Sequence, residues 1–328
     1  MPPLGLVQNI NFRGPSGGGG GLPPSPPQNV SAQAGNEQVD VSWDALDPEP
    51  EGGYQVYYSE TNDFEFALQS SPVASPSDTS HIILGTINGT LYYVWVVAIN
   101  GNGESDPSEV ITTFSPASIA GLKLWLKGNG VAYNTGTTQA TDGQTVETWV
   151  DSSGQGNNAT QATGIRRPVF KDIGGVKSLL TAGTEWMDTT WNAGSTCSIF
   201  VVYKNSGTTN GRWVSGGNNW LLGPYSFNYS YYSNTGFAGG STSSNGNTSI
   251  RLHNAVQTSS GGQHWLNGVS QGTVGSAGAP GIISAPGTYL SGGELGSGHI
   301  YEVIGYDSAL SESDRQLVEN YLLTKYGI

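Results

Sequence analysis

Cysteine and charged residues are scarce in this chain of 328 residues. The single cysteine, Cys197, has no partner for an internal disulfide, and the four histidines show no metal-ligand spacing. Only 11% of the residues are charged, against about 25% in an average soluble protein. We therefore expect a fold held together by apolar packing and hydrogen bonds, without disulfides.

Basic residues are the scarcer of the two charge types. Twelve Lys and Arg against 25 Asp and Glu give a formal net charge of −13, the wrong sign for a nucleic-acid backbone or an anionic membrane surface. No stretch approaches the roughly 18 apolar residues of a membrane span, and the N-terminus lacks the basic start and apolar run of a secretion signal. We expect no nucleic-acid binding, no membrane insertion and no export through a signal peptide.

Glycine and aromatic residues are plentiful, and the acidic residues are concentrated in one region. Residues 24–116 contain thirteen acidic residues and no Lys or Arg, whereas residues 117–328 contain twelve acidic and eleven basic residues. Runs of turn-forming residues at 14–27 and 115–118 lie at these changes in composition. We therefore expect an N-terminal arm and linker at 1–23, a first domain at 24–116 and a second domain at 117–328.

The segment 24–116 alternates apolar and polar residues between Gly, Pro and Asn turns, which predicts a β-sandwich. It resembles a fibronectin type III domain in four stretches: PPQNVSAQ, VDVSWDAL, GYQVYYSE and INGTLYYVWVVAINGNGESDPS. The resemblance implies a structural role for Tyr92, whose hydroxyl would cap the turn before the late strands.

The segment 117–328 also alternates, and only its end has a helical pattern. Ser311 followed by Asp314 predicts the start of a helix, and Lys325 with Gly327 predicts its end. Three stretches resemble the concanavalin-A-like lectin/glucanase superfamily in its laminin-G-like branch: GLKLWLKGNGV, VETWVDSSGQGNNATQATGIRRPVF and GHIYEVIGYDSALSESDRQLVENYLLTKYGI. The expected fold class is all-β, with a fibronectin type III sandwich, a larger jelly-roll sandwich and one C-terminal helix.

An enzyme of the glycoside hydrolase type would need two carboxyl groups placed about the scissile bond. The glucanase branch of the resembled superfamily places them as Glu-x-Asp-x-x-Glu, and this run is absent. Glu147 and Asp151 have the wrong spacing, and Glu294 and Glu302 stand alone. We therefore expect no catalytic residues.

The loop from Asp151 to Asn158 is rich in side-chain oxygens. One interpretation is a calcium site with Asp151 and Asn157 as ligands. The other is a turn in which these side chains bind their own backbone without any ion. We favour the turn and expect no cofactor, with calcium as the alternative.

The densest aromatic run lies between Trp213 and Phe237, where every second residue from Tyr225 to Tyr231 is aromatic. This pattern predicts a strand with its rings on one face. That face is either core, which we favour for Phe227, or a platform on which sugar rings stack while neighbouring amides bind hydroxyls. The glycan-binding candidates are Trp213, Trp220, Tyr225, Tyr229, Tyr232, Asn218 and Asn219.

The resemblances together imply a recognition protein that works outside cells, although no signal peptide is present. A bacteriophage virion protein assembled in the host cytoplasm reconciles these features: a tail or neck fibre, a spike or a head decoration. We expect a multicopy, non-enzymatic protein that binds host-surface polysaccharide. Its N-terminal arm would dock on other virion proteins through Leu4, Leu6, Val7, Ile10 and Phe12. The alternatives are a purely structural virion decoration and an extracellular, secreted bacterial carbohydrate-binding module.

Overall fold

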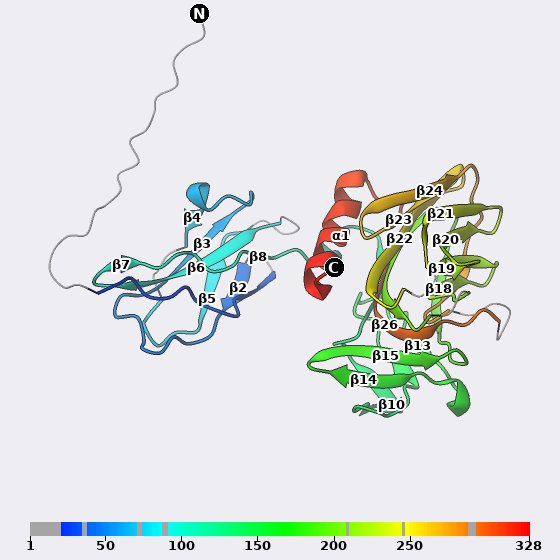
Figure 1. Cartoon of the computed structure of the whole chain (residues 1–328), viewed down its shortest axis with the longest axis horizontal. Coiled ribbons are helices and arrows are strands. Elements are labelled where there is room, and N and C mark those ends of the chain that lie inside the picture. The colour runs from blue at the N-terminus through cyan, green and yellow to red at the C-terminus, as the bar shows by residue number, and fades with distance from the viewer. Residues whose placement is uncertain are drawn as a thin grey trace, which may run out of the picture. The chain divides into compact units, whose positions relative to one another are not determined.

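The structure is a computed structural model that describes residues 21–34, 38–70, 74–86, 91–207, 210–244, 247–287 and 293–328. The five apolar residues proposed as the docking arm, Leu4, Leu6, Val7, Ile10 and Phe12, lie outside the described residues. The chain divides into two compact units between Ser118 and Ile119. Each unit is built almost entirely of strands (Figure 1).

The smaller unit is a sandwich of two antiparallel sheets. Within the described residues, one sheet contains β1 (Ser31–Ala34), β2 (Gln38–Ser42) and β5 (Ser80–Leu84). The other contains β3 (Gly53–Ser59), β4 (Leu68–Gln69), β6 (Tyr93–Asn100), β7 (Gly103–Glu104) and β8 (Ile111–Thr112). A 3-10 turn, η1 (Phe64–Phe66), lies between β3 and β4.

The core of the smaller unit follows the period-2 pattern of its strands. Val39 and Val41 from one sheet pack with Val94 and Val96 from the other, and Trp43 lies against Tyr54 at 5.1 Å between ring centroids. Tyr92 is buried in the same core. The alternation in the sequence therefore places one face of each sheet inside.

The larger unit is a second sandwich, with a ten-stranded sheet and an eight-stranded sheet in the described residues. The ten-stranded sheet contains β10 (Ala132–Thr135), β11 (Thr138–Gln139), β12 (Thr148–Trp149), β13 (Ala159–Thr160), β16 (Asp188–Ala193), β18 (Val214–Gly216), β19 (Trp220–Tyr225), β20 (Asn228–Ser233), β21 (Phe237–Ser243) and β25 (Gly281–Ser284). The eight-stranded sheet contains β9 (Leu122–Lys127), β14 (Val169–Ile173), β15 (Val176–Ala182), β17 (Cys197–Asn205), β22 (Ile250–Thr258), β23 (Gly261–Leu266), β24 (Val269–Val274) and β26 (Ser297–Tyr306).

The two sheets of the larger unit enclose a core rich in aromatic rings. Leu124, Leu126, Ile199 and Val201 come from the eight-stranded sheet. Rings of the ten-stranded sheet, such as Trp220, pack against them. Because aromatic side chains bury large apolar areas, they supply much of the stabilising contact here.

The C-terminal helix α1 (Glu312–Tyr326) lies against the outer face of the eight-stranded sheet (Figure 1). Ser311 accepts a hydrogen bond from the backbone of Asp314 at its start, and Gly327 adopts a left-handed conformation at its end. Val318 and Leu322 are fully buried. The expected all-β fold class, with two sandwiches and one C-terminal helix, is confirmed.

Candidate functional site

Three of the aromatic glycan-binding candidates lie inside the larger sandwich. Trp213 and Trp220 are 0% exposed and Tyr229 is 1% exposed, and all three belong to the core between the sheets. A ring without accessible surface offers no face to a sugar. The prediction of a surface platform is therefore wrong for these residues, which instead fill the core.

The aromatic run is interrupted by a hairpin turn. β19 ends at Tyr225 and β20 begins at Asn228, and the two turn residues, Ser226 and Phe227, both have positive φ angles, 48° and 67°. Phe227 is 52% exposed at this turn, so its expected position in the core is wrong. The even spacing of the rings spans two strands and does not place them on one face of a single strand.

Three other rings form a cluster on the outer face of the ten-stranded sheet, which we call the outer aromatic patch: Tyr225, Tyr232 and Phe237. Tyr232 pairs with Phe237 across β20 and β21. The ring centroids of Tyr232 and Phe237 are 4.5 Å apart, and Tyr225 stacks on Phe237 at 5.0 Å. Tyr231 lies in the core, so its neighbour Tyr232 points to the opposite face.

The outer aromatic patch is accessible to solvent. Phe237 is 50% exposed, and Tyr225 and Tyr232 are partly exposed. Asn228 lies on the same face of β20 as Tyr232 and is also partly exposed. The sequence pointed to Tyr225 and Tyr232, and Phe237 is the member of the patch that was not among the candidates. The patch combines flat apolar faces with nearby amide and hydroxyl groups.

The amide candidates Asn218 and Asn219 form the turn between β18 and β19. Asn218 donates a hydrogen bond to the carbonyl of Ala279 at 3.0 Å. Asn219 has a φ of 61° and accepts from the Arg212 guanidinium at 2.8 Å. Both side chains are therefore engaged in holding this turn.

The carboxylate of Asp151 is surrounded by hydrogen-bond donors from its own loop and from the neighbouring strand β9. It accepts from the backbone nitrogens of Trp125 at 2.8 Å, Ser153 at 2.9 Å and Asn157 at 2.9 Å, and from the Ser153 hydroxyl at 2.7 Å. The Asn157 amide donates to the carbonyl of Lys123. These contacts correct the interpretation of Asp151 and Asn157 as cation ligands, because a cation would have to displace the donors.

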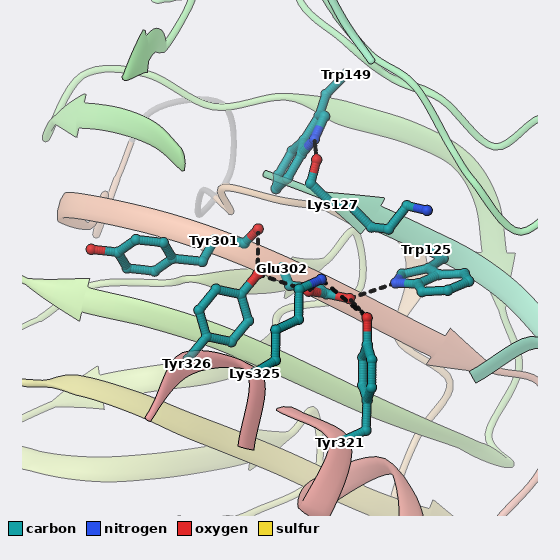
Figure 2. Close-up of polar contacts among 8 residues, drawn as sticks. All are labelled: Trp125, Lys127, Trp149, Tyr301, Glu302, Tyr321, Lys325 and Tyr326. Carbon is teal, nitrogen blue, oxygen red and sulfur yellow. Dashed lines mark hydrogen bonds and ion pairs between the residues drawn. The ribbon is translucent and has the colours of Figure 1, made fainter. Parts of the chain in front are cut away.

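Glu302 on β26 is the most enclosed carboxylate among the described residues, with 0% exposure. It accepts hydrogen bonds from Trp125 Nε1 at 2.6 Å, Lys325 Nζ at 2.6 Å, Tyr326 Oη at 2.7 Å and Tyr321 Oη at 3.2 Å (Figure 2). Lys325, Tyr321 and Tyr326 all lie on α1, so this cluster fastens the helix to the sheet. Both carboxylate oxygens are engaged, which leaves Glu302 a structural role.

Two buried histidines form a polar pair in the core of the larger unit. His253 Nε2 and His264 Nδ1 are 2.9 Å apart, and both residues are 0% exposed. Burial lowers the pKa of His264 to about 4 and lowers the pKa of His253 well below its ordinary value. Both are therefore neutral at physiological pH. Among the described residues, no group of three or more His, Cys, Asp or Glu could hold a metal ion.

Comparison with known families concerns mainly the smaller unit. The family model of the fibronectin type III domain matches residues 25–114. Residues 25–114 form a fibronectin type III domain. Its two sheets and the buried Trp43 and Tyr92 are the structural counterpart of that match.

Two curated proteins are each similar to the chain over a stretch of 98 residues. A Kelch domain-containing protein of Saccharolobus solfataricus is 34% identical over them, which is 30% of this chain and 12% of that protein. A tail tube protein of Bacillus phage SPP1 is 33% identical over 98 residues, which is 30% of this chain and 33% of that protein. The chain thus spans a third or less of the length of these two relatives.

The chain has a distant likeness to a solved structure. Domain 4 of AbnA, a GH43 extracellular arabinanase from Geobacillus stearothermophilus solved in complex with arabinotriose, is similar at 14% identity and a TM-score of 0.42. The similarity covers 60% of this chain and 97% of that structure.

Within the described part of this chain, no helix is long and apolar enough to cross a membrane.

Proposed function

We propose that the chain is a non-enzymatic surface protein of a bacteriophage virion, and that its larger unit binds glycans of the host surface. The observation that carries the proposal is the outer aromatic patch, in which Tyr225, Tyr232 and Phe237 lie together, partly exposed, on one sheet face. Most described large aromatic side chains of this unit are buried, so a group of three adjoining rings that stay partly accessible suggests a ligand.

The chemistry of the patch suits a sugar ring. A pyranose presents C–H bonds on one face and hydroxyl groups at its edge. Its C–H face can therefore pack on the rings of Phe237 and Tyr232, while its hydroxyl groups form hydrogen bonds with tyrosine hydroxyls of the patch and with the amide of Asn228. Residues 117–328 carry twelve acidic and eleven basic residues, so no large field repels either a neutral or a charged glycan.

The virion assignment is supported by the similarity of 98 residues to a tail tube protein of a Bacillus phage. In this proposal residues 1–23 dock on another virion protein, and many copies display the larger unit on the particle. Multivalent display raises the apparent affinity of a weak single site by about 10²- to 10⁴-fold. A single shallow patch is then sufficient for adsorption.

A non-enzymatic role is supported by the engagement of the carboxylates. Glu147 pairs with Arg167 at 3.1 Å, Glu294 with Arg212 at 2.7 Å and Glu302 with Lys325 at 2.6 Å. Glycoside hydrolysis needs one protonated and one ionised carboxyl group facing the substrate. Each of these three carboxylates is already engaged in an ion pair within the protein.

The test is a glycan array probed with the full chain displayed in many copies on a bead. The proposal predicts binding to a defined subset of surface polysaccharides, with no release of sugar over time. Absence of binding to every glycan at multivalent display would overturn the glycan-binding role and favour the structural decoration. Immunogold labelling of phage particles tests the virion assignment, which fails if mature particles carry no label.

A further inference from the structure

A buried arginine organises the turn between β18 and β19. Arg212 is 3% exposed, and all three of its side-chain nitrogens are engaged. Nη1 donates to the carbonyl of Trp220 at 2.9 Å, and Nη2 donates to Asn219 Oδ1 at 2.8 Å. Nε donates to Glu294 Oε2 at 2.8 Å, and Nη2 lies 2.7 Å from the same oxygen. One guanidinium thus holds the side chains of Asn219 and Glu294 next to each other.

Each of these two side chains uses only one of its two polar atoms to bind the arginine. No hydrogen bond within the described residues engages Asn219 Nδ2 or Glu294 Oε1. Both residues are partly exposed, and neither atom is among the described buried polar atoms that lack a partner. The side chain of Glu294 is 26% exposed, against 4% for Arg212. One hydrogen-bond donor and one acceptor therefore face solvent beside a buried cation.

The backbone fixes the positions of both side chains. Asn219 has a φ of 61° and Glu294 has a φ of 54°. A left-handed backbone is uncommon for residues other than glycine, and it is less common for Glu than for Asn. The carbonyl of Glu294 also accepts a hydrogen bond from the backbone nitrogen of Arg212 at 2.8 Å. Because sparsely populated backbone conformations gather at binding sites, this arrangement indicates a site in which the amide and the carboxylate are held in place before a ligand binds.

The Arg212 contacts lie beside the outer aromatic patch. Leu221 pairs with Tyr232 across β19 and β20. Tyr231 belongs to the core, so Tyr232 and its partner Leu221 point to the outer face of the sheet. Trp220, whose carbonyl accepts from Arg212, immediately precedes Leu221. The polar pair held by Arg212 is therefore close enough to the patch for one bound oligosaccharide to contact both.

We propose that Asn219 and Glu294 bind two neighbouring hydroxyl groups of a glycan that packs on the outer aromatic patch, and that Arg212 is the residue that positions them. Asn219 Nδ2 only donates and the Glu294 carboxylate only accepts, whereas a sugar hydroxyl does both. A metal cation needs acceptors alone and an anion needs donors alone, so the mixed pair suits neither. The inference rests on the proposed glycan-binding function and names the feature that the site selects: a sugar with two adjacent unsubstituted hydroxyls.

The probes are dextran, mannan, galactan and xylan, each as the native polymer and as its O-methylated form, presented to the full chain displayed in many copies on beads. A glycan that binds on the array takes their place if none of the four binds. O-methylation keeps the sugar rings and removes the hydroxyl donors. The inference predicts that the native form binds at least about tenfold more tightly, because a hydrogen bond to a carboxylate is lost on methylation. Equal binding of the two forms would overturn it.

Asn219→Asp keeps an oxygen that accepts from Arg212 and replaces the donor by a second acceptor. Aspartate tolerates the left-handed backbone, so the turn should fold, and binding of the native glycan should weaken by about tenfold or more. The matched control is Asn267→Asp in a hairpin turn of the other sheet. Asn267 has a φ of 47°, and its side-chain oxygen likewise accepts a hydrogen bond, from the backbone nitrogen of Leu252 at 2.9 Å. Equal glycan binding by the two variants would contradict the inference.

Glu294→Gln is the second probe. Because Arg212 holds the amide oxygen of the new side chain, its NH₂ group faces solvent and the acceptor becomes a donor, so this variant alone should also bind about tenfold more weakly. Combined with Asn219→Asp, it restores one donor and one acceptor in exchanged positions, and the double variant should bind more tightly than either single variant. A purely structural role predicts losses that add, so a double variant weaker than both single variants would overturn the inference. A melting curve of each variant verifies folding.

The outcomes separate this inference from the proposed function. If Asn219→Asp binds the glycan as tightly as the wild type while Phe237→Ala does not, the inference is wrong and the proposed function stands. If none of the four polymers and no glycan of the array binds, the proposed function fails and the inference fails with it. If binding requires both Asn219 and Phe237, both are supported.

Discussion

Tyr232 and Phe237 are cross-strand partners on the outer face of the ten-stranded sheet, with 4.5 Å between their ring centroids. Phe237 remains 50% exposed in this arrangement. The two adjacent rings, tilted by 40° to each other, stay partly accessible over a sheet whose other face is buried, and they offer an apolar surface on which a sugar ring can pack. The glycan-binding hypothesis therefore depends on this pair.

Phe237→Ala should weaken glycan binding by about tenfold, because stacking on one ring contributes about 1 to 1.5 kcal/mol. The unfolding midpoint should change little, since the ring is half exposed. Binding is measured by surface plasmon resonance on immobilised glycan. Phe66→Ala is the matched control, because Phe66 is 75% exposed in the other unit. Equal glycan binding by Phe237→Ala and Phe66→Ala would contradict glycan binding at the outer aromatic patch.

Glu302→Gln should loosen the C-terminal helix. The change removes a buried carboxylate that accepts from Lys325, Tyr321, Tyr326 and Trp125, so Lys325 loses its ion pair. Breaking a buried ion pair by removing one partner costs about 3 kcal/mol or more. Urea unfolding measures this loss. Glu312→Gln, at an exposed position in the first turn of the same helix, should cost less than about 1 kcal/mol.

Acid should destabilise the larger unit through the histidine pair. The pKa of His264 falls from its ordinary value of 6.5 to about 4 in the folded state, and that of His253 is also lowered. Between about pH 6.5 and pH 4, His264 binds a proton in the unfolded chain but not in the folded chain. Stability is therefore complete above about pH 6.5 and decreases as the pH falls toward 4.

The decrease can be followed as the urea midpoint at several pH values. For each additional proton that the unfolded chain binds, the free energy of unfolding decreases by about 1.4 kcal/mol per unit of falling pH. His264→Gln removes one of the titrating groups and should give a shallower dependence on pH. The matched control is His81→Gln in the smaller unit, whose own histidine titration should leave the transition of the larger unit unchanged. An identical pH dependence in wild type and His264→Gln would contradict the account.

Removal of divalent cations should leave the larger unit unchanged. The Asp151 carboxylate already accepts four hydrogen bonds, three from its loop and one from the backbone of Trp125 on β9, so the loop does not depend on an ion. A chelator should not shift the melting temperature, whereas Asp151→Ala should destabilise the unit by about 2 to 4 kcal/mol because it leaves buried donors unpaired. A lower melting temperature in chelator would restore the calcium interpretation.

Local signals in the sequence predicted several elements accurately. Ser311 caps the start of the C-terminal helix with its hydroxyl group, and Gly327 ends the helix in a left-handed conformation, as the sequence predicts. Asn-Gly is a local hairpin signal of the same kind, and Asn267-Gly268 forms the turn between β23 and β24 with φ angles of 47° and 78°. These predictions succeeded because a few neighbouring residues determine the backbone conformation.

The candidate site was only partly predictable. Period-2 alternation reveals two faces of a strand, but Tyr231 and Tyr232 are both aromatic, so the residue types do not tell which face is inside. The turn at Ser226 and Phe227 contains neither glycine nor asparagine, so its signal is absent and the aromatic run reads as one strand.

The most direct test of the glycan-binding claim is hydroxyl-radical footprinting of the full chain with and without a glycan that it binds. The account predicts that oxidation of Tyr225, Tyr232 and Phe237 decreases when the glycan is present, while oxidation of Phe66 is unchanged. Unchanged oxidation of all three patch residues at a saturating glycan concentration would contradict it.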